Sequence, residues 1–327
     1  MNKLEVAREA LKVYEISSAR LALLKNVYNT TYRVIARNGE QYVLRISHPR
    51  RAVPDIVRSE LLWLAALRDD LCTHVPQPVM NRVMQYVTIL PDSENHRTHL
   101  CALFRWTTGR FLSRSLSPSH LLRVGELMAH LHDHATHWNL PAGFIRPCVE
   151  SLNPLEQEQG DAFDRAIAAS AAEAVASVST REHGALVAAV IRKVWSVLQR
   201  LGDGPADFGL IHADVHQWNY LFHGGQVGVI DFDDCGFGHW LYDLAVTLYC
   251  LSDRPDFAAL RSAFLTGYRQ SRPLSSEQER GLESFMALRR LQDLLWVIGE
   301  RHKPAFRDRW QTLTMDSLRR LRDFIRP

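Results

Sequence analysis

The sequence predicts an α+β fold with two lobes, and three observations support this prediction. The chain has 327 residues, which is long for a single hydrophobic core and suits about two domains. Its first third contains short segments that alternate apolar and polar residues between turn sequences, as half-buried β-strands do. In the remainder, apolar residues recur at the spacing of amphipathic helices. We therefore expect a small antiparallel sheet in residues 1–106 and a mostly helical lobe in residues 107–327.

The expected elements of the first lobe are a helix, three antiparallel strands, a second helix and a last strand. The tight turn at Asn38-Gly39-Glu40 separates the second strand from the third. In chain order the segments are residues 1–16 (helix), 23–36 (strand, turn, strand), 41–46 (strand), 53–67 (helix) and 100–106 (strand).

The second lobe is expected to be helical except for one hairpin. An acidic, alanine-rich stretch followed by an amphipathic run indicates a helical insertion ahead of the hairpin. The segments are residues 121–134 (helix), 154–201 (helical insertion), 220–230 (hairpin), 255–268 (helix) and 275–325 (helices).

The most informative segment runs from Leu210 to Leu244. Its first part is HADVHQWN, in which Asp214 is followed by Asn219 five positions later. A short hairpin with a Gly-Gly turn comes next, and Asp231 ends the apolar return strand. We expect this hairpin to bring Asp214, Asn219 and Asp231 together.

These residue types suit the transfer of a phosphoryl group to a hydroxyl. Such a reaction needs an aligned acceptor and a Mg²⁺ ion that neutralises the phosphates, and it needs little covalent chemistry from the protein. Asp214 can accept the proton of the hydroxyl. Asn219 and Asp231 carry oxygen ligands of the kind that hard cations prefer. We therefore predict Asp214 as the base and Asn219 and Asp231 as the metal ligands.

The spacing matches the catalytic loop and the metal-binding Asp of protein kinases. The sequences HADVHQWN and IDFDD resemble the aminoglycoside phosphotransferase and choline kinase group more closely, because Ala213 and Asp233 replace the Arg and Gly of protein kinases. Within that group the chain is also similar to type II homoserine kinases and to stress-response kinases. The resemblance implies a protein-kinase-like bilobal fold, with ATP and Mg²⁺ as cofactors and residues 1–106 as the ATP-binding lobe.

The resemblance also assigns nucleotide-binding roles in the first lobe. Arg45 takes the place of the third-strand Lys that holds phosphate, and Glu60 is its expected partner on the following helix. A solvated Arg and a surface Glu are the alternatives for these two positions. Two further sets complete the prediction, and a plain polar turn is the alternative for the first. They are Asn29, Thr30 and Thr31 as phosphate contacts, and Arg105 and Trp106 as the hinge that contacts adenine.

The acceptor is expected to be a small hydroxyl compound that carries an amine. Carboxylates and aromatic residues, among them Asp293, Glu300, Tyr242 and Trp296, follow Asp231 in the chain, and together they suit a cationic group. An amino alcohol, an amino sugar or an aminoglycoside-like or choline-like compound fits this composition. The carboxylates predicted to bind it are Asp233 and Asp234.

Two other functional classes remain open from the sequence. One is a Ser/Thr protein kinase of the bacterial stress-response type, although no A-P-E segment follows Asp231. The other is a nucleotide-binding pseudoenzyme, although Asp214, Asn219 and Asp231 are all present. The resemblance assigns Asp243 and His132 to structural support beneath the catalytic loop.

Composition limits the partners. The net charge of +3 does not favour nucleic acid, and no run of about 18 apolar residues predicts a membrane span. We expect a cytoplasmic protein that is a monomer or a homodimer, with scattered cysteines as thiols. His130, His134 and His137 share one helix face, where a zinc site is an alternative to ordinary surface residues.

Overall fold

The computed structural model describes residues 1–16, 20–49, 52–71, 74–92, 97–150 and 165–326. The chain forms two compact units, each assembled from three segments. The first unit comprises Met1–Phe111, Trp138–Arg146 and Tyr220–Asp233. The second comprises Leu112–His137, Pro147–Asn219 and Asp234–Pro327. These units differ from the predicted division after residue 106, because two later segments return to the first unit.

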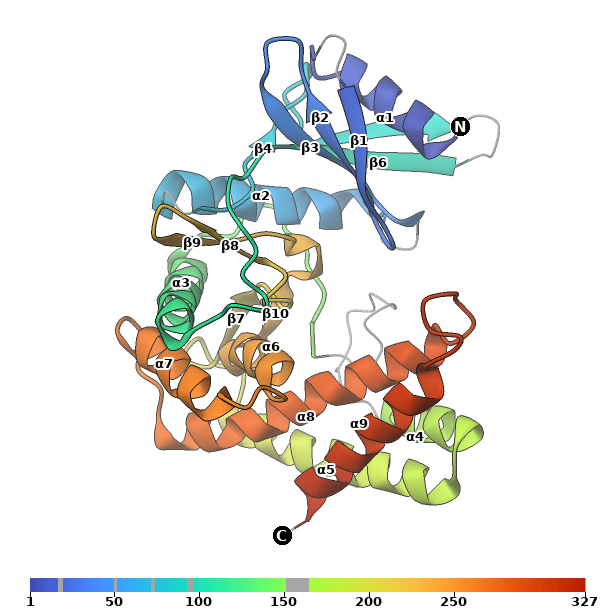
Figure 1. Ribbon diagram of the computed structural model, residues 1–327, viewed down its shortest axis with the longest axis vertical. Coiled ribbons are helices and arrows are strands. Elements are labelled where there is room, and N and C mark those ends of the chain that lie inside the picture. Colours follow the sequence, from blue (N-terminus) through green and yellow to red (C-terminus); the bar gives the residue numbers. More distant parts are fainter. Residues whose placement is uncertain (17–19, 50–51, 72–73, 93–96, 151–164, 327) are drawn as a thin grey trace. The chain divides into compact units, whose positions relative to one another are not determined.

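A six-stranded antiparallel sheet is the centre of the first unit (Figure 1). Its order is β1-β2-β3-β6-β4, and β5 pairs with β6. The strands are β1 (Arg20–Asn26), β2 (Thr30–Ile35), β3 (Gln41–Ile46), β4 (Pro78–Val79), β5 (Val87–Asp92) and β6 (Arg97–Arg105). The α+β class and the first three antiparallel strands are confirmed. β4 and β5 were not predicted, because one is two residues long and the other contains Pro91, which weakens the strand pattern.

The helix α1 (Lys3–Lys12) packs its apolar side against this sheet. It begins with a capping box in which the Asn2 side chain accepts from the backbone of Glu5, while the Glu5 side chain accepts from the backbone of Asn2. Val6 and Ala10 are fully buried and belong to one core cluster with sheet residues such as Leu44. The amphipathic spacing of the first residues therefore becomes a helix that covers the sheet.

The β8–β9 hairpin joins the first unit through backbone pairing. Arg110 and Phe222 exchange two hydrogen bonds, of 3.0 and 3.1 Å between N and O. Behind the hairpin, the ring of Phe232 meets Trp63 of α2 edge-to-face at 5.5 Å. These contacts explain why the hairpin groups with the sheet although it follows the catalytic loop in sequence. The elements are α2 (Pro54–Leu71), β8 (Tyr220–His223) and β9 (Gln226–Val229).

Within its described residues, the regular structure of the second unit is helical apart from one short strand pair. β7 (Phe208–Ile211) pairs antiparallel with β10 (Gly236–His239), so the catalytic loop begins where β7 ends. The predicted insertion forms α4 and α5, and its first residues, 154–164, lie outside the described part of the chain. The helices are α3 (Pro118–His137), α4 (Arg165–Val178), α5 (Arg181–Leu201), α6 (Trp240–Leu251), α7 (Phe257–Arg269), α8 (Ser276–Gly299) and α9 (Trp310–Ile325).

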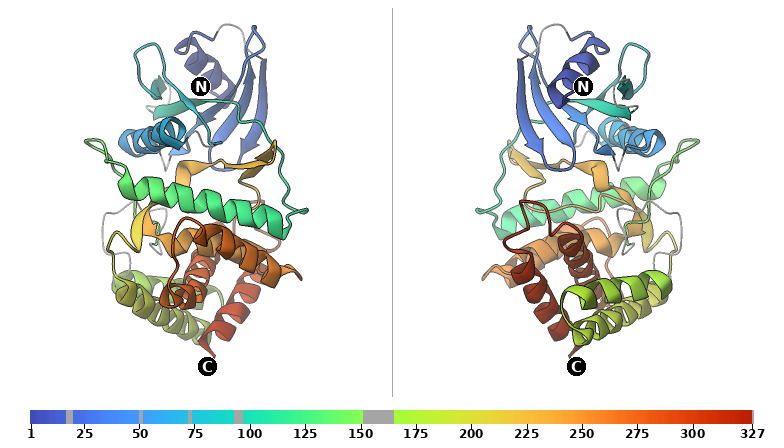
Figure 2. Two further views of the ribbon diagram at one scale, coloured as in Figure 1. Left: turned by 90° about the vertical axis from the view of Figure 1, so that its left-hand side faces the viewer. Right: turned by 90° about the vertical axis from the view of Figure 1, so that its right-hand side faces the viewer.

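Two glycines allow α3 and α7 to pack closely, and Figure 2 shows these helices side by side. A Cβ on Gly125 would lie 2.1 Å from the carbonyl oxygen of Phe264, and a Cβ on Gly267 would lie 1.9 Å from that of Leu122. Backbone atoms cannot move aside as a flexible side chain can. The contact that places α3 therefore requires both glycines.

Replacing Gly125 with Ala is expected to destabilise the protein by about 2–3 kcal/mol, because the added methyl group overlaps the backbone of α7. The free energy of unfolding in urea measures this effect. Gly204→Ala is the control, since no atom lies within 4 Å of its added Cβ. Equal midpoints for the two variants would contradict the close packing.

Candidate active site

The loop after β7 has a strained backbone that one buried carboxylate holds in place. Ala213 has a φ of +69°, which residues with a Cβ rarely adopt. Asp243, which is fully buried in α6, accepts the N–H of His212 at 2.9 Å and the N–H of Ala213 at 2.6 Å. Hydrogen bonds to an ionised carboxylate are among the stronger ones and offset the strain. Asp243 thus has the supporting position expected of it.

A second buried residue completes this support. His132 of α3 lies 3.1 Å from Asp243 through Nε2 and 2.9 Å from the Tyr268 hydroxyl through Nδ1. Burial lowers the pKa of His132, and the Asp243 carboxylate opposes this shift only in part. The ring is therefore neutral, with Nε2–H donating to Asp243 and Nδ1 accepting from Tyr268. Three elements of the second unit meet in this network, and all of its polar groups are paired.

The remaining histidines of α3 do not gather around one point. His130 contacts Ser271 at 3.4 Å, and His137 Nδ1 donates to the carbonyl oxygen of Asp133 at 2.8 Å. Among the residues that the structure describes, no group of three or more His, Cys, Asp or Glu side chains is arranged to hold a metal ion.

Asp214 is largely buried and is held by three side chains. Its Oδ1 accepts from Arg289 at 3.0 Å, while Oδ2 lies 3.3 Å from both His216 Nε2 and Asn219 Nδ2. His216 Nδ1 accepts from the backbone of Trp218, so the ring proton is on Nε2 and points to Asp214. Burial raises the pKa of Asp214, but the His216 hydrogen bond and the charge of Arg289 hold this pKa well below its usual value. The carboxylate is therefore ionised.

The side chain of Asn219 is oriented by the same loop. Its Nδ2 donates to the carbonyl oxygen of Asp214 at 2.9 Å as well as to the carboxylate. Because the amide nitrogen faces Asp214, the amide oxygen points to the other side. An oxygen presented in this way is a suitable ligand for Mg²⁺.

In the first unit, Arg45 of β3 and Glu60 of α2 form the predicted ion pair. Arg45 Nη1 and Nη2 donate to the two Glu60 oxygens at 2.7 and 2.6 Å, and both residues are buried. Burial lowers the pKa of the Arg45 guanidinium, but the Glu60 carboxylate reverses this shift and the pKa is raised. The Nε of Arg45 is buried without a hydrogen-bond partner. Arg45 therefore has one donor left that a phosphate oxygen would satisfy.

Asp231 lies two residues after the end of β9 and has a φ of +72°. Lys25 Nζ of β1 lies 3.4 Å from its Oδ2. The charges of Asp231 and Asp233 also act on Arg45. The unpartnered Nε of Arg45 suits a phosphate oxygen, and the carboxylate of Asp231 suits a Mg²⁺ ion.

The turn between β1 and β2 is tied to the segment after Asp231. Asn29 Nδ2 donates to Asp233 Oδ2 at 2.7 Å, and Asn29 Oδ1 accepts from the backbone of His48 at 2.9 Å. Thr30 is buried and donates to Asn26 at 2.8 Å, so its hydroxyl stabilises the turn. Thr31 is half-buried and lies opposite Arg45 in the β2–β3 register. Among these three residues, Thr31 has the position best suited to phosphate.

The backbone N–H groups of the predicted hinge residues form hydrogen bonds within the first unit. The N–H of Arg105 donates to Gln77 at 2.8 Å, and that of Trp106 donates to Gln41 at 3.0 Å. The guanidinium of Arg33 stacks on the Trp106 ring at 4.7 Å. Neither N–H group remains for adenine, so a contact at these residues depends on carbonyl oxygens or on the ring.

Four contacts made with Asp214, Asp231 and Asp233 were not predicted from the sequence. Lys25 reaches Asp231, His216 and Arg289 reach Asp214, and Arg146 donates to the carbonyl of Asp233 at 2.7 Å. His216 could have been found, since it stands two residues after Asp214. The other three lie far from their partners in sequence and resemble ordinary surface cations.

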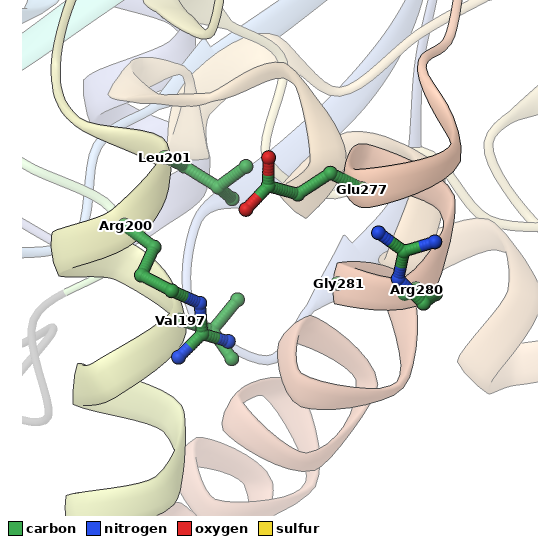
Figure 3. Close-up of a pocket in the computed structure, with 6 residues that line it drawn as sticks. All are labelled: Val197, Arg200, Leu201, Glu277, Arg280 and Gly281. Atoms are coloured by element: carbon green, nitrogen blue, oxygen red, sulfur yellow. The ribbon is translucent and has the colours of Figure 1, made fainter.

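A cavity of about 170 Å³ lies between α5 and α8 (Figure 3). Its lining is Val197, Arg200, Leu201, Glu277, Arg280 and Gly281. It contains none of the predicted site residues, and Gly281 is about 12 Å along α8 from Arg289 at 1.5 Å per residue. This cavity is separate from the surroundings of Asp214.

The sequence profile of the phosphotransferase enzyme family, which includes the aminoglycoside phosphotransferases, matches residues 21–282. The chain belongs to this family. The match includes the Arg45–Glu60 pair, the catalytic loop and Asp231. The recognition made from HADVHQWN and IDFDD is therefore confirmed.

Curated relatives and solved structures agree with this membership. The chain is 24% identical over 301 residues to amicoumacin kinase of Bacillus subtilis, covering 88% of this chain and 82% of that protein. It is 27% identical over 282 residues to homoserine kinase of Methylobacillus flagellatus, covering 84% and 78%. A microcompartment-associated aminopropanol kinase superposes with a TM-score of 0.77 at 27% identity, covering 99% and 98%. An amicoumacin kinase solved with AMP-PNP and Ca²⁺ gives 0.78 at 18% identity, covering 98% and 94%.

The protein is therefore a small-molecule phosphotransferase with a protein-kinase-like fold. No helix in the described ranges is long and apolar enough to cross a membrane.

Glu60→Gln is expected to lower the free energy of unfolding by about 3–5 kcal/mol, because it leaves the buried Arg45 charge without its counterion. Urea denaturation of the purified protein measures this loss. Glu40→Gln is the control, since Glu40 meets Arg105 at an exposed position and its replacement should leave the midpoint unchanged. A Glu60→Gln variant as stable as this control would show that the pair does not hold β3 to α2.

Proposed function

We propose that this protein transfers the γ-phosphate of ATP to a hydroxyl group of a small, amine-bearing molecule. The chain belongs to the phosphotransferase enzyme family, and one structure that it resembles is that of an aminopropanol kinase. The observation that carries the proposal is the Asp214 carboxylate, which is kept ionised and oriented on a strained loop. Because ATP is the donor, we place the activity in the cytoplasm.

Asp214 is proposed as the residue that receives the proton of the acceptor hydroxyl. Its lowered pKa makes it a weak base at neutral pH, and a weak base takes the proton late in the reaction. This suits phosphoryl transfer, in which the transition state is loose and the acceptor oxygen gains little bond order early. The main contribution of Asp214 is then to orient the hydroxyl in line with the phosphate.

Asn219 and Asp231 are proposed as the ligands of Mg²⁺. Bound Mg²⁺ would neutralise charge on the phosphates of ATP. Asn219 supplies the amide oxygen that points away from Asp214, and Asp231 supplies a carboxylate. Arg45, oriented by Glu60, is proposed to bind phosphate through its unpaired Nε. Arg can serve here because its planar group donates to Glu60 and to phosphate in different directions.

The amine of the acceptor is proposed to bind the carboxylates after Asp231. Asp233 Oδ2 already accepts from Asn29, so Asp233 contributes mainly its negative charge. Asp234 is half-buried at the end of the 3-10 turn Phe232–Asp234, and we propose that it contacts the amine directly. A charged contact of this kind would favour amino alcohols over neutral alcohols.

The proposal is tested by incubating the protein with γ-labelled ATP and Mg²⁺ and with a panel of acceptors. The panel contains aminopropanol, ethanolamine, choline, homoserine, amino sugars and aminoglycosides, with propanediol as the neutral counterpart and casein as a protein substrate. Label on an amine-bearing small molecule is the expected result. Label on casein alone would favour a protein kinase, and label on neither would favour a pseudoenzyme.

Asp214→Asn is expected to lower kcat by roughly 10²–10⁴-fold, because the amide cannot accept the proton of the hydroxyl. Nucleotide affinity, measured by calorimetry with ADP and Mg²⁺, should stay within about twofold. The matched control is Asp203→Asn, at an exposed loop position of the second unit. Wild-type turnover in Asp214→Asn would refute the base assignment.

Asp231→Ala is expected to remove the Mg²⁺ dependence of nucleotide binding, because the metal loses its carboxylate ligand. The Kd of AMP-PNP is compared with and without Mg²⁺ in the variant and in the wild-type protein. Binding in the absence of metal should differ little between the two. If Mg²⁺ still strengthens binding to the variant as much as to the wild type, Asp231 is not a metal ligand.

A further inference from the structure

Arg289 of α8 holds the catalytic loop at two points. Its Nη2 donates to Asp214 Oδ1 at 3.0 Å, and its Nη1 donates to the carbonyl oxygen of Ala213 at 3.2 Å. Only 20% of its side-chain surface is exposed, against 16% for Asp214. One guanidinium group therefore binds both the reactive carboxylate and the peptide that precedes it.

The peptide group held by Arg289 belongs to the strained residue of the loop. Ala213 has its N–H bound by Asp243 of α6 and its carbonyl oxygen bound by Arg289 of α8. Its φ of +69° is thus fixed from both sides by elements that come later in the chain. Strained backbone persists only where the surroundings determine it, and such strain is common at functional sites.

The carboxylate of Asp293 also lies beside the guanidinium. Asp293, one helical turn further along α8, forms an ion pair with Arg289 at 3.2 Å from Nε, but this Nε makes no hydrogen bond. The direction of the guanidinium is therefore set by the hydrogen bonds of its two Nη groups to the loop. The arrangement uses the planar fork of Arg, since a Lys ammonium at the same place is a single point charge on a flexible stem.

We propose that Arg289 is a positioning residue, which orients the Asp214 carboxylate for the acceptor hydroxyl by fixing it together with the Ala213 peptide. This inference rests on the proposed role of Asp214 as the base. A small displacement of a catalytic group has a large effect on rate, of about 10²-fold for 1 Å. Arg289 therefore acts on kcat through Asp214 and leaves acceptor binding to other residues.

Two other roles for the same contact make different predictions. If Arg289 bound the acceptor directly, its removal would raise the acceptor KM and leave kcat nearly unchanged. If Arg289 blocked Asp214 in the resting protein, its removal would raise kcat. The positioning role predicts a lower kcat with the acceptor KM within about twofold.

The test compares Arg289→Ala and Arg289→Lys with the wild-type protein, using ADP release with aminopropanol and with water as acceptors. We expect kcat to fall on the order of 10²-fold in Arg289→Ala. Arg289→Lys should recover part of the loss, since Lys can meet Asp214 or Ala213 but not both in one plane. Guanidinium ion at millimolar concentration should restore part of the activity of Arg289→Ala. A kcat within twofold of wild type in Arg289→Ala would overturn the proposal, as would an effect on KM alone.

Arg290→Ala is the matched control on the same helix. Arg290 places its guanidinium over the ring of Tyr249 at 4.7 Å and has no contact with the loop among those described. Its kcat should stay within about twofold of wild type. The melting temperature and the Kd for ADP and Mg²⁺ show whether each variant is folded. If Arg289→Ala does not fold, Arg289→Lys carries the test, because a full kcat in that variant would also overturn the proposal.

A double-mutant cycle separates this inference from the proposed function. If Arg289 acts through Asp214, adding Arg289→Ala to Asp214→Asn should lower kcat by less than about threefold further. Full activity in Asp214→Asn would refute the proposed function itself. An inactive Asp214→Asn together with a fully active Arg289→Ala would leave the proposed function standing and refute only the positioning role. Independent losses in the double variant would show that Arg289 does not act through Asp214.

Discussion

The geometry of the catalytic loop depends on the buried carboxylate of Asp243. It accepts two consecutive backbone N–H groups, and it does so without any exposure to solvent. A carboxylate in this position needs a donor on its other side, which His132 provides, and His132 in turn needs Tyr268. The strained φ of Ala213 and the direction of Asp214 follow from this set of hydrogen bonds. A local pattern of residues thus becomes a reactive geometry only when α3, α6 and α7 pack correctly.

Each unit contains one Arg–carboxylate pair that is shielded from water. Arg45 and Glu60 join a strand to a helix in the first unit, and Arg289 and Asp214 join a helix to a loop in the second. The two pairs differ in how the carboxylate oxygens are used. Both oxygens of Glu60 are used by Arg45, so Glu60 serves to orient the cation. In the other pair the carboxylate is the proposed base, and Arg289 shares its donors between Asp214 and a backbone carbonyl.

Much of the fold could be predicted because periodicity is local. Aromatic and β-branched residues in TTYRVI and QYVLRI, on either side of a tight turn, predict adjacent strands, and the buried positions of β2 alternate as in a half-buried strand. The short strands β4 and β5 were missed because two residues, or a strand with a proline, show no clear period. Local sequence patterns also could not predict the division into two units. This division depends on the pairing of Arg110 with Phe222, which lie 112 residues apart in the sequence.

The sequence by itself determined the residue types of the reaction and their local spacing. Asp214 and Asn219 belong to one loop, and a tight hairpin connects this loop to Asp231. The candidate roles of these three residues could therefore be predicted from the sequence. Only the tertiary structure decided which charge accompanies each of them. Arg289 is 75 residues from Asp214, and Lys25 is 206 residues from Asp231. The physical reason is that a carboxylate as shielded as that of Asp214 requires a partner of opposite sign, but the choice among 39 Lys and Arg residues depends on how distant elements pack. Lys25 is exposed, and its contact with Asp231 likewise exists only because the fold brings β1 to that carboxylate.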